Sequence, residues 1–160
     1  MTSRSRWILR GALAAFTLVW LVVLLVSRGD DAGEEIGDTR FIRAAESVCA
    51  EIGVKIRDRL PPGSNASFEE RAASVDRIRG LLEEMARRLR ALPVIPADAD
   101  AVDRWLSNLE SFNIVGRRYA GAIRSGDEKA IARVGHEGDR PNAAFNATSR
   151  RNDIDNCVLG

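Results

Sequence analysis

The stretch from residue 67 to residue 92 constrains the fold of this chain more than any other. Ser67 followed by Glu70 has the spacing of a capping box, in which each side chain binds an otherwise unpaired backbone N–H at the start of a helix. Apolar residues then recur every three or four positions up to Pro93: Phe68, Ala72, Val75, Ile78, Leu82, Met85, Leu89 and Leu92. A long amphipathic helix must bury its apolar face, so this pattern predicts a fold of packed helices.

Two further segments show the same period. The first follows Asp38 or Thr39, either of which suits an N-cap, and ends before Pro61-Pro62-Gly63. Its apolar stripe is Phe41, Ala45, Val48, Ile52 and Ile56. The other begins after a cap at Asp98 or Asp100 and carries Val102, Trp105, Leu106, Leu109, Phe112, Tyr119 and Ile123. Trp105, Phe112 and Tyr119 follow one another at intervals of seven residues. Core packing explains this spacing, and an exposed stripe for interaction is the alternative.

A fourth helix, capped by Asp127, has the weakest pattern. Its stripe is Ile131, Val134, Phe145 and Thr148, interrupted by Gly135, Gly138 and Pro141. Proline inside a helix removes one backbone hydrogen bond, so we expect a break or kink near Asp139. Because the connections are short, neighbouring helices should run antiparallel. The predicted fold is therefore all-α, an up-down-up-down four-helix bundle over residues 39–160.

The first residues of the chain predict a membrane anchor. An uncharged run from Gly11 to Val26 follows Arg4, Arg6 and Arg10 and precedes Asp30, Asp31, Glu34 and Glu35. Extended back to Trp7, about 20 residues span roughly 30 Å, the thickness of a bilayer's hydrocarbon core. Arginine-rich flanks stay in the cytoplasm, which places the N-terminus inside and the bundle outside. We expect residues 1–28 to form an uncleaved transmembrane helix in the lipid bilayer and residues 29–38 to form a tether.

Cleavage of the same run as a secretory signal remains the alternative, although Leu25 at the −3 position before Ser27 suits a cut poorly. The bundle would then be secreted. In either case it lies outside the cytoplasm, where disulfides form, so we predict that the two cysteines, Cys49 and Cys157, are paired. In an up-down-up-down bundle, the start of the first helix and the end of the fourth lie at the same end. The C-terminal tail can therefore reach Cys49.

Charge and motifs exclude several classes of function. All 23 acidic side chains follow Arg28, whereas four of the 24 basic ones lie at or before it, so the bundle is mildly acidic and has no electrostatic footprint for nucleic acid. One histidine cannot supply a di-iron bundle site, and no zinc, haem or phosphate-binding motif is present. The sequence predicts no catalytic residues, no metal site and no cofactor, and hence no enzyme.

One cluster suggests a contact site. His136, Glu137, Arg140 and Asn142 gather where the fourth stripe loses its regularity, and such irregularities often mark functional sites. We treat these four residues as a candidate contact for a small ligand or a protein partner. The alternative is that they are ordinary surface residues of a kinked helix.

Several short stretches resemble a group of uncharacterised actinobacterial membrane-anchored or secreted small helical-bundle proteins with one cysteine pair. They are "AAESVCAEI", "LRALPVIP", "DRWLSNLE" and a final "DIDNC", behind the arginine-flanked apolar start. The resemblance implies a helical bundle outside the cytoplasmic membrane and no known activity.

The leading interpretation is a membrane-anchored extracytoplasmic module that binds a protein partner at the cell envelope. The alternative is a bundle that holds a small ligand between its helices, which a pocket lined by His136 or Tyr119 would indicate. A solid core with an exposed apolar patch would indicate the partner module instead.

Overall fold

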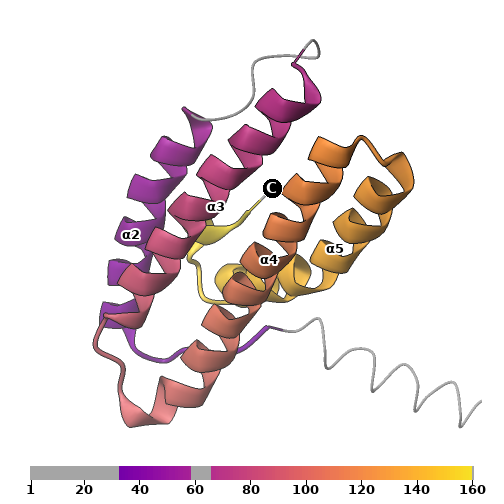
Figure 1. Cartoon of the computed structure of the whole chain (residues 1–160). Helices are drawn as coiled ribbons and strands as arrows, with labels where there is room; N and C mark the ends of the chain where they lie inside the picture. The colour runs from indigo at the N-terminus through magenta and orange to yellow at the C-terminus, as the bar shows by residue number, and fades with distance from the viewer. Residues whose placement is uncertain (1–32, 59–65, 160) are drawn as a thin grey trace, which may run out of the picture. The chain divides into compact units, whose positions relative to one another are not determined.

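The computed structural model describes residues 33–58 and 66–159. Figure 1 shows that consecutive helices run in opposite directions. They are α2 (Thr39–Arg57), α3 (Phe68–Arg90), α4 (Ala99–Ser125) and α5 (Glu128–Arg151), with short 3₁₀ helices η1 (Pro96–Asp98) and η2 (Asp155–Cys157). The described part of the chain contains no strand. The prediction of an all-helical fold with four packed helices is confirmed.

Local side-chain caps start three of the four helices. Ser67 and Glu70 form the predicted capping box: the Ser67 N–H donates to Glu70 Oε2 at 2.8 Å, and the Glu70 N–H donates to Ser67 Oγ at 3.3 Å. The side chains of Asp38 and Asp127 accept backbone N–H groups in the first turns of α2 and α5. These bonds satisfy donors that have no partner within the helix, which is why the helices begin at these residues.

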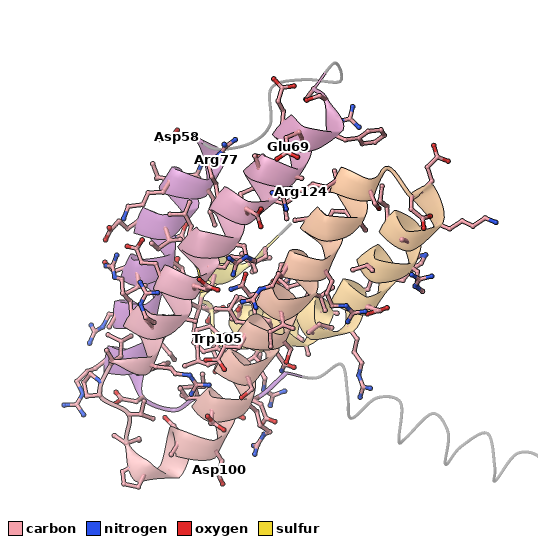
Figure 2. The ribbon with its side chains drawn as sticks, viewed as in Figure 1. Asp58, Glu69, Arg77, Asp100, Trp105 and Arg124 are labelled. Carbon is pink, nitrogen blue, oxygen red and sulfur yellow. A yellow bond between two sulfur atoms is a disulfide. The ribbon has the colours of Figure 1, made fainter. Side chains whose placement is uncertain are left out.

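The centre of the core is Trp105 of α4. Its ring stacks parallel to that of Phe145 at a centroid distance of 5.1 Å and meets Phe41 edge-on at 6.2 Å. The indole N–H donates to the Phe145 carbonyl at 3.2 Å and to Ser149 Oγ at 3.1 Å. A buried indole needs such a partner, so these contacts join α2, α4 and α5 at one point. Trp105 is labelled in Figure 2.

Of the break or kink expected near Asp139, the break does not occur, because α5 is one helix through Pro141; Figure 1 shows the C-terminal half of α5 running in a different direction from its first half. Proline removes only its own N–H bond, and the packing of α5 against α4 holds the helix together on both sides of that position. Gly138, one turn before the proline, lies beside Phe112 of α4. Figure 1 shows the C-terminal half of α5 (yellow) passing behind α4.

The segment just before α2 is part of the folded unit. This compact unit begins at Gly33, inside the range predicted to be a tether. Ile36 is buried, and its N–H donates to Asn152 Oδ1 at 2.7 Å. The Asn152 amide in turn donates to the Glu34 carbonyl at 2.6 Å. Residues 33–38 are therefore fastened to the end of α5 by hydrogen bonds and by one buried apolar side chain.

Asp98 stands at the predicted N-cap of α4 but makes no side-chain cap bond there. Its Oδ2 atom instead accepts the backbone N–H groups of Gly37 at 3.0 Å and Asp38 at 2.8 Å. The carboxylate is buried and binds the start of α2 to the start of α4.

The predicted anchor, residues 1–28, and the first part of the predicted tether, residues 29–32, lie outside the described residues. Within residues 33–58 and 66–159, none of the helices combines the length and hydropathy needed to cross a bilayer.

Candidate functional site

The two cysteines form the predicted disulfide. Cys49 in α2 and Cys157 in η2 have Cα atoms 4.9 Å apart, and both residues are fully buried. The tail that carries Cys157 packs against α2 and against the end of α5, so it closes the bundle between the first and last helices. Because a thiolate cannot reach buried sulfur atoms without local unfolding, this bond acts as a structural crosslink.

The four residues proposed as a contact site lie along α5 and do not converge on one pocket. His136 is exposed, with Nδ1 at 3.1 Å from Asp139 Oδ2. Glu137 forms an ion pair with Arg118 of α4. Arg140 is exposed, and Asn142 is half-buried, with Oδ1 accepting a long hydrogen bond of 3.4 Å from the amide of Asn146.

A groove of about 260 Å³ opens between α3, α4 and α5. We call it the α3–α5 groove. Its lining is mostly apolar: Val75, Ile78 and Leu82 from α3, Phe112, Val115 and Tyr119 from α4, and Val134 from α5. Of the two residues expected to line a ligand pocket, Tyr119 lies in this wall and His136 does not.

The groove continues the apolar stripes of the core. Farther along α3, Met85 and Leu89 are fully buried, whereas Val75 and Ile78 are only half-buried. Val75 and Ile78 therefore form part of the groove wall, where the apolar stripe of α3 is only partly covered by the neighbouring helices.

Glycine residues of α5 leave the space open. A Cβ added at Gly138 would lie 3.5 Å from Phe112 Cε2, and one at Gly135 would lie 3.8 Å from Tyr119 Cε2. Both distances are ordinary van der Waals contacts, so the glycines are not forced by a clash. Their missing side chains instead leave the aromatic rings of α4 uncovered along this part of the groove.

Two polar residues line the same groove. Asn113 is 8% exposed, and its Oδ1 atom makes no hydrogen bond within the described part of the chain. Arg79 Nε is also buried without a hydrogen bond there. Buried polar atoms almost always have a partner, so these two atoms leave unused hydrogen-bonding capacity on two residues that line the groove. Asn113 also borders a second cavity of about 340 Å³ that is lined by residues of α3 and α4.

Asn113 and Arg79 are not among the contact residues predicted from the sequence. The sequence contains a pattern that could have identified Asn113. This residue stands four positions after the core residue Leu109 and seven before the buried Ala120, so it lies on the same apolar stripe of the helix. A polar residue at such a position of an apolar stripe must find a partner in the interior.

The charge of Arg79 is already matched within the protein. Its Nη1 atom pairs with Glu83, and its Nε atom lies 3.8 Å from Asp76 Oδ1. Asp76 also accepts a hydrogen bond from Arg124 at 2.5 Å, and Arg124 lies beside Glu69 at the end of the bundle where α3 begins (Figure 2). The hydrogen bonds that Arg124 donates to Asp76, first, and to Glu69 raise the pKa of Arg124. These ion pairs all use carboxylates of α3, the helix that carries one side of the groove.

The described residues contain no group of three or more histidine, cysteine, aspartate or glutamate side chains placed to hold a metal ion. Comparisons of the chain with protein-family models, with curated proteins and with solved structures find no match.

Proposed function

We propose that this protein is a non-catalytic binding module that holds the alkyl chain of an amphiphile in the α3–α5 groove. The observation that carries the proposal is the groove itself, an apolar cleft of about 260 Å³ with two unpaired polar atoms in its wall. Small-molecule sites have this composition, with mostly apolar linings and a few polar groups that orient the ligand.

The protein-partner interpretation has less support from the described surface. The large apolar side chains exposed there are Val54, Phe68 and Ile114, and they belong to three different helices. Single exposed apolar residues are normal on soluble proteins, whereas partner sites are contiguous patches. Tyr119 lines a groove, which is the feature expected of the ligand-binding alternative.

We further propose that the module lies on the outer side of the cytoplasmic membrane, held by residues 1–28. The arginine-flanked apolar run supports this location, and so does a buried disulfide, which forms in oxidising compartments. A module in that location would meet amphiphiles at the outer face of the membrane. Release of the bundle after signal cleavage would leave the groove unchanged.

The test is photoaffinity labelling of the full chain in lipid nanodiscs with a decane probe that carries a diazirine and no polar group. We expect crosslinks on groove residues of α4, such as Phe112 and Tyr119, when labelled peptides are mapped by mass spectrometry. The variant Gly135→Leu fills the groove beside Tyr119 and should reduce this labelling about tenfold.

The matched control is Gly121→Leu. Gly121 also lies within a helix, but it is exposed, lines no part of the groove and has no heavy atom within 4 Å of an added Cβ. Both substitutions replace glycine by a better helix former, which favours the helix by up to about 1 kcal/mol, so neither should unfold the protein. Equal labelling of the two variants, or labelling confined to residues 1–32, would contradict the proposal.

A further inference from the structure

We infer that the ligand of the α3–α5 groove is a neutral amphiphile whose polar group both donates and accepts a hydrogen bond, such as a long-chain alcohol or primary amide. The inference rests on the proposed function and specifies its ligand class. It excludes the anion of a fatty acid as the preferred ligand.

The two unpaired atoms have complementary needs. Asn113 Oδ1 is an acceptor that lacks a donor, and Arg79 Nε–H is a donor that lacks an acceptor. A hydroxyl or a primary amide can satisfy both atoms at once, because each of these groups has an N–H or O–H together with an oxygen acceptor. A carboxylate has only acceptor atoms and leaves Asn113 Oδ1 unpaired.

Arg79 of α3 and Asn113 of α4 both line the α3–α5 groove. Arg79 Cγ is 4.0 Å from the place where a Cβ on Gly116 would stand. Gly116 is three residues after Asn113, which is about one turn of α4, or roughly 5 Å along its axis. Arg79 on α3 therefore approaches α4 about one turn away from Asn113.

Charge also disfavours an anion. Glu83 and Asp76 already flank the Arg79 guanidinium, so the groove offers no uncompensated positive charge. A carboxylate bound beside Arg79 would lie close to both acidic side chains and would lose its hydration in an apolar groove. A neutral head group does not carry this cost.

The experiment is competition against the headless diazirine probe with 1-decanol, decanamide and decanoate, using the full chain in nanodiscs at a pH where decanoate is ionised. The labelling of groove peptides is divided by the labelling of phospholipid in the same sample. This ratio corrects for differences in how strongly the competitors partition into the nanodisc bilayer. We expect the alcohol and the amide to halve groove labelling at concentrations about tenfold lower than decanoate does.

The variant Asn113→Leu tests the assigned contact. It removes the acceptor and places an apolar side chain in an apolar stripe, so the variant should fold and still bind the headless probe. The concentrations of the three competitors that halve groove labelling should then lie within about twofold of one another. The control Asn142→Leu changes a half-buried asparagine of α5 that does not line the groove, and it should keep the full preference.

The outcomes separate the two proposals. Failure of the headless probe to label groove residues of the wild-type protein contradicts the proposed function itself. If the probe labels the groove and decanoate competes as well as or better than decanol, the binding function stands and the inference about the head group is wrong. A preference that survives Asn113→Leu also overturns the inference.

Discussion

The Oδ2 atom of Asp98 lies 2.8 Å from the backbone nitrogen of Asp38 and accepts its N–H. The residue just before α4 is therefore hydrogen-bonded to the N-cap residue of α2. The same oxygen accepts the N–H of Gly37. One buried carboxylate therefore satisfies two backbone donors that lie some 60 residues earlier in the chain.

Replacement of this carboxylate should destabilise the fold. We expect Asp98→Ala to lower the free energy of unfolding by about 2 to 4 kcal/mol, because two partly buried N–H groups lose their acceptor. Asp98→Asn keeps one oxygen and should cost less. Urea denaturation followed by circular dichroism measures the change. Asp100→Ala, an exposed carboxylate two residues later, should change stability by only about 0.5 kcal/mol, and an equal loss in both alanine variants would contradict the assigned role.

The disulfide should provide a large part of the stability. It closes a loop across 108 positions, for which the chain-entropy model gives about 4 to 5 kcal/mol. We expect the double variant Cys49→Ala, Cys157→Ala to lose up to this amount in urea denaturation. The reduced wild-type protein should behave in the same way. Alkylation of the unreduced, denatured protein should label neither cysteine, and labelling of both would show that the bond does not form in the native protein.

The contact between α2 and α3 should weaken in acid. Hydrogen bonds from Arg88, first, and Lys55 lower the pKa of Glu51 from 4.5 to about 2. Because the folded state holds this carboxylate ionised, its contribution is present above pH 4.5 and is lost as the pH falls toward 2.

Urea midpoints of the wild-type protein and Glu51→Gln test this dependence. The wild type should be the more stable protein at pH 7, and the difference should shrink between pH 4.5 and pH 2. Glu51 is half exposed, so 1 M salt, with a Debye length of about 3 Å, should also reduce the difference at pH 7. A difference that is constant with pH would show that the ion pairs contribute nothing measurable.

The proposed location can be tested through lysine chemistry. The chain has two lysines, Lys55 and Lys129. Lys129 is exposed near the start of α5, whereas Lys55 is engaged by Glu51 and Glu84. A membrane-impermeant amine reagent should therefore modify Lys129 in intact cells, with at least about tenfold less modification of a cytoplasmic marker protein. Modification of Lys129 only after lysis would place the bundle inside the cell.

The sequence by itself determined the helices, most of their starts and the cysteine pairing. The Ser67–Glu70 box and the Asp127 cap involve residues three apart, so their hydrogen bonds can be inferred before any tertiary contact is known. The pairing of Cys49 with Cys157 was also within reach, because two cysteines in an oxidising compartment allow only one intramolecular disulfide. The four predicted contact residues of α5, by contrast, did not indicate the groove.

Only the tertiary structure decided what Asp98 binds and where the groove lies. The sequence places Asp98 before a helix. Its buried oxygen accepts backbone N–H groups about 60 positions away, which lie beside it only when the segments that precede α2 and α4 come together in the fold. The groove depends on the register that sets Gly135 opposite Tyr119 and leaves Asn113 buried without a donor. Neighbouring residues specify a local hydrogen bond, whereas a cavity results from the incomplete fit of surfaces that are distant in the sequence.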